Sequence, residues 1–255
     1  MAMRQVETVH TKFQRIDVWR SAEEVEFRVA GATHAWWHAR RYLTGLAWDN
    51  LAAACLLRPA GPPESVLMLG LAGGTTMRVL RHLLPECRFT AVEIDAEIVD
   101  VARRHMDLDA SGIEVVIDDA YAWLRRCRRK FDVVIDDVYL AGAEDVYRPE
   151  AWEETHVGLL RGAVAKGGLL TANLVTGQGH RAMQSRLRRL FRAAFPVVRS
   201  VTTRDSLNET LVGGEAVADG RALLPWEPSF ATHRDRDLWR RIRVRMLGLG
   251  PRCIP

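Results

Sequence analysis

Hydrophobic and polar positions change their pattern along the 255-residue chain. Near the N-terminus they alternate with period two from Glu24 to Val29, which predicts a half-buried strand. The segment Phe13–Trp19 is expected to pair with it as a hairpin. The stretch Trp36–Leu57 is expected to be helical, and the prolines and glycine of residues 59–63 then break the chain before the next pattern begins.

From residue 65 onward, continuous apolar segments alternate with helical segments. Strands that are buried on both faces and joined by helices are typical of a parallel, doubly wound sheet. The predicted strands are Ser65–Leu69, Arg88–Val92, Ile113–Ile117, Phe131–Ile135 and Leu169–Val175. After a helix over 179–195, the segments Val197–Thr203 and Thr210–Val212 follow each other without an intervening helix. They predict an antiparallel hairpin that closes the sheet.

These patterns divide the chain into three parts and predict its fold class. Residues 1–60 are expected to form a small N-terminal β-hairpin and a connecting helix. Residues 61–220 are expected to form an α/β domain with a mostly parallel, Rossmann-like sheet that ends in the antiparallel hairpin. Residues 221–255 are expected to form a tail that packs on this domain through an amphipathic piece near Leu238, Ile242 and Met246.

Composition excludes several classes of protein. With 48% hydrophobic and 27% charged residues, the chain has the balance of an ordinary globular protein, not that of a disordered, collagen-like or coiled-coil chain. No apolar run approaches the ~18 residues that a membrane span requires. The N-terminus has no apolar segment typical of a secretory signal. A cytoplasmic location is therefore expected, with no membrane partner.

The basic residues predict no nucleic-acid partner, and the cysteines predict no metal site. The net charge is +4, and all basic residues except Lys12, Lys130 and Lys166 are arginine. The arginines of 186–192 and 240–245 recur at spacings that give a solvated helix face, so nucleic acid is not an expected partner. The four cysteines form no CxxC motif, and His34 and His38 lack a third ligand, so no metal site is predicted.

Carboxylates follow the ends of three predicted strands, and a glycine-rich loop, 70–74, follows the first strand. The acids are Glu93 with Asp95, Asp118 with Asp119, and Asp136 with Asp137. Open α/β sheets bind ligands beyond the carboxyl ends of their strands. This edge is therefore the predicted site, although glycines of a tight turn and acids that cap helices would look the same.

The loop and the acid after it resemble a dinucleotide-binding signature only in outline. Glu93 follows Gly70 at the expected distance, but Ala72 and Thr75 replace two glycines of G-x-G-x-x-G. Asp119 could accept a hydrogen bond from an adenine amino group, and the reversed hairpin belongs to the methyltransferase variant of the fold. S-adenosylmethionine is therefore predicted over NAD, with Glu93 accepting hydrogen bonds from its ribose hydroxyls.

The same residues carry a family resemblance over residues 8–215. The runs VLMLGLAGGTTMRVLRHLLPECRFTAVEIDAEIVDVARRHM, VVIDDAYAWL, FDVVIDDVYLAG and VAKGGLLTANL resemble the spermidine synthase (polyamine aminopropyltransferase) family, and in particular its broad spermidine synthase-like branch. The segment TKFQRIDVWRS is similar to the N-terminal hairpin of that family. The resemblance implies a SAM-methyltransferase-type fold, S-adenosylmethionine or decarboxylated S-adenosylmethionine as cofactor, and a homodimer.

The resemblance also implies roles for individual residues. Gln14 would reach the cofactor, Glu93 would hold the ribose and Asp119 the adenine. Asp137 matches the aspartate that assists deprotonation of the attacking amine. Apart from the resemblance, the side chains of His38 and Tyr139 make them predicted catalytic helpers, with His34 or Tyr42 as further candidates. The predicted cofactor-binding residues are Gln14, Gly70, Ala72, Gly73, Gly74, Glu93, Ile94, Asp118, Asp119, Ala120 and Asp137.

Departures from the family pattern shape the expected reaction. Spermidine synthases carry a second Asp three residues after the first, followed by Pro, where this chain has Leu140 and Ala141. Their acidic stretch after the hairpin is replaced here by 35–42, in which Arg40 and Arg41 would repel a dication. Methyl transfer to a small aromatic, apolar or anionic acceptor is therefore predicted. Aminopropyl transfer from decarboxylated S-adenosylmethionine, aminocarboxypropyl transfer, and a non-catalytic scaffold with this fold are the alternatives.

Overall fold

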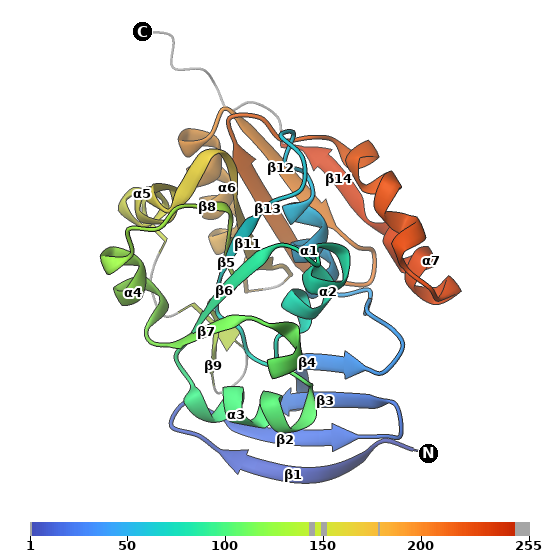
Figure 1. The fold of residues 1–255 in the computed structure, drawn as a ribbon. Coiled ribbons are helices and arrows are strands. Elements are labelled where there is room, and N and C mark those ends of the chain that lie inside the picture. Colours follow the sequence, from blue (N-terminus) through green and yellow to red (C-terminus); the bar gives the residue numbers. More distant parts are fainter. Residues whose placement is uncertain (1, 143–145, 149–151, 178, 248–255) are drawn as a thin grey trace, which may run out of the picture.

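A small antiparallel sheet covers the carboxyl edge of a large, mostly parallel sheet (Figure 1). The computed structural model describes residues 2–142, 146–148, 152–177 and 179–247. The predicted α/β class, with a Rossmann-like sheet and a terminal antiparallel hairpin, is confirmed. Among the described residues, no helix is long and apolar enough to span a membrane.

The N-terminal sheet contains four antiparallel strands in chain order. They are β1 (Arg4–His10), β2 (Arg15–Arg20), β3 (Glu24–Val29) and β4 (Ala32–His38). The predicted hairpin corresponds to β2 and β3, and the alternation of Ile16 and Val18 does bury both side chains. The sheet is nevertheless twice as large as predicted, because β1 and β4 extend it on either side.

The predicted helix over 36–57 is wrong in its first part. Residues up to His38 belong to β4, and helix α1 covers only Ala47–Cys55. The chain reverses between β3 and β4 at Ala30 and Gly31, both with positive φ, as in a two-residue type I′ turn. Because Ala-Gly lacks the usual Asn or Asp of such turns, the sequence gives a weak signal there. Bulky aromatic residues such as Trp36 and Trp37 pack readily on a pleated sheet.

The large sheet has the strand order β14-β12-β13-β11-β8-β5-β6-β7. The five predicted parallel strands are β5 (Ser65–Leu69), β6 (Arg88–Glu93), β7 (Glu114–Ile117), β8 (Phe131–Asp136) and β11 (Val164–Val175). They pair in parallel with one another, and β11 also pairs antiparallel with the closing hairpin. The predicted hairpin is β12 (Val197–Thr202) and β13 (Asn208–Gly214), and the tail adds β14 (Arg243–Met246) beside β12.

Helices cover both faces of this sheet and create two apolar cores. One face carries α1, α2 (Thr75–Leu83), α3 (Ala96–His105) and α7 (His233–Arg241); the other carries α4 (Ala120–Arg126), α5 (Glu154–Gly162) and α6 (Arg181–Ala194) (Figure 1). The sequence of β5 is continuously apolar because its two faces lie in different cores. Val66 and Met68 pack in the first core, whereas Leu67 and Leu69 pack in the second.

Short elements complete the chain. They are the 3-10 helices η1 (Asp109–Ser111) and η2 (Gly220–Ser229), and the two-residue strands β9 (Leu140–Ala141) and β10 (Val146–Tyr147). In the tail, Ile242 and Trp239 are buried against the first core and Leu238 packs on it. Met246, which was expected to pack with them, is 54% exposed.

Candidate active site

A pocket of about 500 Å³ lies where the carboxyl ends of the inner strands face the N-terminal sheet. We call the part of the pocket beyond the ends of β5 and β6 the β5–β6 half. It is lined by Gln14, Gly70, Leu71, Ala72, Glu93, Ile94, Asp95, Ile98, Asp119 and Ala120. We call the opposite part the β11–β13 half; it is lined by Leu46, Ala47, Trp48, Leu140, Asn173, Val175, Asp205, Leu207 and Asn208. Asp137 lies between them because β8 separates β5 from β11.

The glycine loop is shaped by the Glu93 carboxylate. Its Oε2 accepts hydrogen bonds from the amides of Leu71 (2.8 Å) and Ala72 (2.9 Å), and its Oε1 accepts one from Asp95 N (3.1 Å). Ala72 has φ +48°, a conformation that costs a non-glycine residue energy. The carboxylate therefore stabilises a strained loop and at the same time faces the pocket.

The glycines of the loop serve close packing more than ligand contact. A Cβ on Gly70 would lie 2.5 Å from the Asp137 carbonyl oxygen, so glycine lets the loop approach β8. A Cβ on Gly73 would lie 2.4 Å from the Cβ of Ala35, which brings the loop against β4. Gly73 and Gly74, both predicted to bind the cofactor, do not line the pocket.

Asp95 joins the two sheets beside the pocket. It caps α3 by accepting a hydrogen bond from Ile98 N, and its other oxygen accepts from the Thr11 hydroxyl (2.7 Å) and Gln14 Nε2 (3.3 Å). These contacts fix the β1–β2 connection over the end of β6. Gln14 therefore lies at the pocket wall, where the sequence predicted it.

The two acids after β7 differ in position. Asp119 lines the pocket and caps α4 through a 2.7 Å hydrogen bond from Ala122 N to its Oδ1. Asp119 therefore caps a helix and also faces the predicted site, so the two interpretations of this residue are compatible. Asp118 does not line the pocket; it pairs with Arg126 on the surface and accepts a hydrogen bond from Asp119 N.

The two acids after β8 point to opposite faces of the sheet, as consecutive strand residues do. Asp136 is fully buried and pairs with Arg148 (2.9 Å), while the Tyr121 hydroxyl donates to it. Arg148 also donates to the carbonyl oxygen of Asn173, at the end of β11. This buried ion pair gives a structural role to Asp136, for which the family resemblance implied none. It also links Arg148 to β11 beside the pocket-lining residue Asn173.

Asp137 faces the pocket with its carboxylate oriented by neighbours. Asn173 Nδ2 donates to Asp137 Oδ1 (2.7 Å), and Asn208 Nδ2 in turn donates to the side-chain oxygen of Asn173 (3.1 Å). Burial raises the pKa of Asp137 to about 7, while the Asn173 hydrogen bond and the Arg148 charge oppose that shift. The carboxyl group is therefore poised to exchange a proton near neutral pH.

Two further predicted candidates, Tyr139 and His34, line the pocket. The Tyr139 hydroxyl donates to the carbonyl oxygen of Asn173 (3.0 Å) and accepts from Val175 N (3.2 Å), so it anchors the chain after Asp137 to β11. Burial raises its pKa, which keeps the phenol neutral. Burial lowers the pKa of His34 on β4, which favours a neutral imidazole there.

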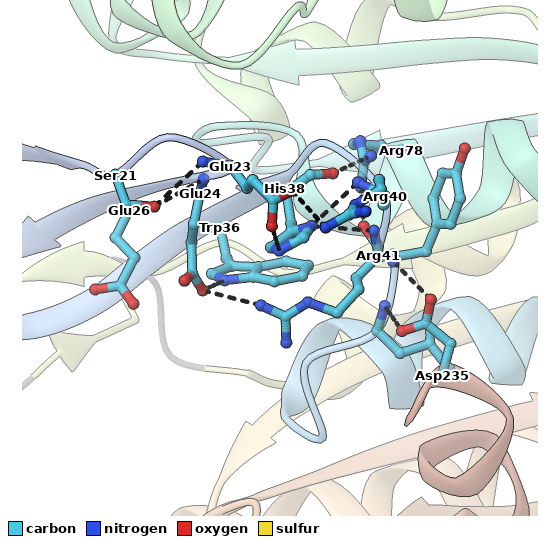
Figure 2. A network of polar contacts seen from close by, with 12 residues as sticks. Ser21, Glu23, Glu24, Glu26, Trp36, His38, Arg40, Arg41, Arg78 and Asp235 are labelled. Atoms are coloured by element: carbon cyan, nitrogen blue, oxygen red, sulfur yellow. Dashed lines mark hydrogen bonds and ion pairs between the residues drawn. The ribbon is translucent and has the colours of Figure 1, made fainter. Parts of the chain in front are cut away.

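His38 and the two arginines expected to repel a dication belong to a separate polar network (Figure 2). His38 stacks on Trp36, and its Nδ1 accepts hydrogen bonds from the amides of Arg40 and Arg41. Arg40 pairs with Glu23 and Arg41 with Glu24. None of these residues lines the main pocket, so the geometry supports neither catalysis by His38 nor the expected repulsion.

The network also holds the connection between β4 and α1. Asp235, from α7, accepts hydrogen bonds from the main chain of this connection (Figure 2), at Tyr42 N and Leu43 N. Asp49, at the start of α1, accepts from Thr44 N and Gly45 N. The two carboxylates thereby present the following residues, 46–48, to the pocket.

The charge of the pocket lining is uneven. Although the chain contains 36 lysines and arginines, none lines the pocket in the part of the chain that the structure describes. Five carboxylates do: Glu93, Asp95, Asp119, Asp137 and Asp205. No group of three or more described His, Cys, Asp or Glu side chains could hold a metal ion. The pocket therefore suits a cationic organic ligand.

Sequence reasoning missed several lining residues. Asn173 carried a signal, because it is a polar residue near the end of the last predicted parallel strand. Trp48, Asp205 and Leu207 carried none, since they reach the pocket from α1 and from the β12–β13 turn. Their position depends on how distant segments pack.

Comparison with known proteins agrees with this geometry. The family model described as spermine/spermidine synthase domain matches residues 53–204. A probable polyamine aminopropyl transferase of Bifidobacterium longum is 33% identical over 133 residues, which is 52% of this chain and 28% of that protein. An eEF1A lysine and N-terminal methyltransferase homolog of Drosophila pseudoobscura pseudoobscura is 42% identical over 79 residues, 29% of this chain and 12% of that protein. The matches thus span less than a third of either relative.

The fold extends the likeness to most of the chain. A probable spermidine synthase from Corynebacterium glutamicum has a crystal structure that superimposes with a TM-score of 0.70 at 16% identity, covering 98% of this chain and 99% of that one. Since the family model covers more than half of the sequence, the chain belongs to the spermine/spermidine synthase domain family.

Proposed function

We propose that this protein is a transferase that moves an aminopropyl group from decarboxylated S-adenosylmethionine to the nitrogen of a small amine. The observation that carries the proposal is the charge of the pocket, five carboxylates with no described lysine or arginine in the lining. Decarboxylated S-adenosylmethionine has a sulfonium and an ammonium and no carboxylate. Such a pocket compensates both charges, which would be costly to bury unpaired.

The β5–β6 half fits the adenosine part of this co-substrate. A carboxylate offers about four lone-pair positions, and Glu93 uses three of them for backbone amides, which leaves capacity for a ribose hydroxyl. Asp119 has a second oxygen beyond the one that caps α4, and Gln14 lines the same pocket from the β1–β2 connection. We assign Glu93 to the ribose, Asp119 to the adenine amino group, and Gln14 to the sulfonium side.

The glycine loop favours the decarboxylated form over S-adenosylmethionine itself. An α-carboxylate needs hydrogen-bond donors or a cation. The amides of Leu71 and Ala72 already donate to Glu93, Gly70 N donates to Val92 O, and Gly74 N donates to Leu71 O. An α-carboxylate beside this loop would therefore find these four amides already donating to other acceptors, which weighs against the methyl transfer expected from the sequence.

Asp137 is assigned as the residue that takes the proton. Bound decarboxylated S-adenosylmethionine would supply a propyl carbon activated by the adjacent sulfonium. The amine nitrogen forms a bond to that carbon as the carbon–sulfur bond breaks, and the sulfur keeps the electron pair as a thioether. The nitrogen must lose a proton, and Asp137, oriented by Asn173 and with a pKa of about 7, can accept it near neutral pH.

Product analysis tests the proposal directly. The full chain would be incubated with an amine mixture and either decarboxylated S-adenosylmethionine or S-adenosylmethionine, and products identified by mass spectrometry. We expect methylthioadenosine and an amine heavier by one aminopropyl group, only with the decarboxylated form. A methylated acceptor with S-adenosylmethionine would establish methyl transfer instead. Absence of product from both, with no binding of either, would support a non-catalytic role for the fold.

A further inference from the structure

The β11–β13 half differs from the rest of the pocket in its apolar lining. Its lining residues come from the start of α1, from the chain after β8, from the end of β11 and from the β12–β13 turn. The apolar members are Leu46, Trp48, Leu140, Val175 and Leu207. Leu46 and Leu207 remain 37% and 73% exposed, so the mouth of the pocket offers uncovered apolar surface to a ligand.

Few anions are available in this half to hold a second positive charge. Asp137, at its inner end, is assigned to the reacting nitrogen. Asp205 lies in an exposed turn, where a single ion pair with a ligand contributes little because water screens it. His34, on the facing strand, favours its neutral form.

A neighbouring cavity of about 180 Å³ does not supply the missing anion. It shares Thr33, Leu46 and Trp48 with the main pocket and contains Glu24 and Glu26. Both carboxylates already have partners. Glu24 accepts from Trp36 Nε1 and pairs with Arg41, as Figure 2 shows. Glu26 pairs with Arg28 (2.6 Å). A second ammonium would have to displace these contacts.

We propose that the acceptor is a primary monoamine on an apolar chain, and that diamines and polyamines are poor acceptors. This inference rests on the proposed function and specifies its substrate class. In this arrangement the amine nitrogen of the acceptor lies at Asp137. The alkyl chain of the acceptor extends past Leu140 and Val175 toward Leu207. Each methylene buried there favours binding, whereas a distal ammonium would lie against leucine and valine without a buried partner.

Matched pairs of amines test the inference. With the full chain and decarboxylated S-adenosylmethionine, kcat/KM would be measured for n-butylamine, n-hexylamine, 1,4-diaminobutane and 1,6-diaminohexane. We expect kcat/KM to rise about fourfold per added methylene among the monoamines. We also expect n-hexylamine to exceed 1,6-diaminohexane by about tenfold or more, because the diamine carries the unpaired charge.

The possible outcomes separate the two proposals. If the diamines react as fast as the matched monoamines or faster, the substrate class is wrong, while aminopropyl transfer stands. If decarboxylated S-adenosylmethionine binds but no amine of the series is alkylated, the proposed function fails and the substrate class fails with it.

A variant sharpens the test. Leu140→Asp would add a carboxylate to the apolar wall, and we expect it to raise the kcat/KM ratio of 1,6-diaminohexane to n-hexylamine about tenfold. The control is Leu224→Asp, since Leu224 is 64% exposed in η2 and lies outside the pocket; its ratio should stay as in the unmodified chain. An unchanged ratio in a folded, active Leu140→Asp protein would show that the acceptor does not pass Leu140, contradicting the inference. The unmodified chain decides the question if that variant does not fold.

Discussion

The carboxylates of the β5–β6 half accept hydrogen bonds from main-chain amides in the connections that follow β5, β6 and β7. The β11–β13 half is instead lined by apolar side chains from segments far apart in the sequence. Glu93 binds the loop at 71–72, and Asp95 and Asp119 cap the helices that follow them. In the other half, Trp48 and Leu207 meet only because α1 and the β12–β13 turn pack at the same sheet edge. The first half is thus organised by hydrogen bonds to main-chain amides, and the second is shaped by tertiary packing.

The largest effect is expected on turnover, from a substitution of Asp137 at the boundary between the two halves. Asp137→Asn keeps the oxygen that accepts from Asn173 but cannot take a proton. We expect kcat to fall about 10²- to 10⁴-fold, the usual contribution of a general base. The affinity for decarboxylated S-adenosylmethionine, measured by calorimetry, should change less than about threefold. A variant that retains full turnover would show that another group removes the proton.

The next largest effect concerns the support of the β11–β13 half. Arg148→Met leaves Asp136 buried without its partner, and breaking one side of a buried pair typically costs about 3–5 kcal/mol. Urea denaturation should show this loss in the free energy of unfolding. The control, Arg126→Met, removes an exposed partner of Asp118 and should cost at most about 1 kcal/mol. Equal effects in both variants would mean that the Asp136–Arg148 pair does not hold the fold together.

A smaller effect is expected within the β5–β6 half. Glu93→Gln removes the charge that the loop amides and the ribose share, and hydrogen bonds to charged groups contribute about 1.5–3 kcal/mol. The Kd for decarboxylated S-adenosylmethionine should therefore rise about 10- to 100-fold. Glu97→Gln, at an exposed position in the first turn of α3, serves as the control and should leave Kd unchanged. If Glu93→Gln binds as tightly as the unmodified chain, Glu93 does not contact the ligand.

The effect that is smallest at any one pH step is a change in the pH dependence of stability. Because the pKa of Asp137 is raised from 3.8 to about 7, the folded state binds more protons than the unfolded state between these values. The free energy of unfolding contributed by this group therefore falls as pH rises through that range. Asp137→Asn should reduce the fall by at most about 1.4 kcal/mol per pH unit. Identical pH slopes in urea titrations would contradict the raised pKa.

The same comparison explains how much could be predicted from the sequence. The inner strands, the closing hairpin and the acids at the strand ends were predictable, because buried parallel strands are continuously apolar and helix caps are local signals. The predicted positions of Glu93, Asp119 and Asp137 around one pocket follow from that pattern.

Other features depend on contacts that the sequence does not display. The end of β4, residues 36–38, was predicted to be helical because the Ala30-Gly31 turn before this strand is atypical. His38 was predicted as a catalytic helper for its imidazole, but it lies in a separate polar network. Gly73 and Gly74 were expected to contact the cofactor, but they pack against β4 and Leu108. The pairing of Asp136 with Arg148 joins residues 12 positions apart, and no periodicity predicts it.

Calorimetric titration of the full chain with decarboxylated S-adenosylmethionine and with S-adenosylmethionine tests the central claim most directly. The pocket, rich in acids and with its loop amides already donating to Glu93 and nearby carbonyls, should bind the decarboxylated form at least about tenfold more tightly, a difference of about 1.4 kcal/mol. Equal or tighter binding of S-adenosylmethionine would contradict the account.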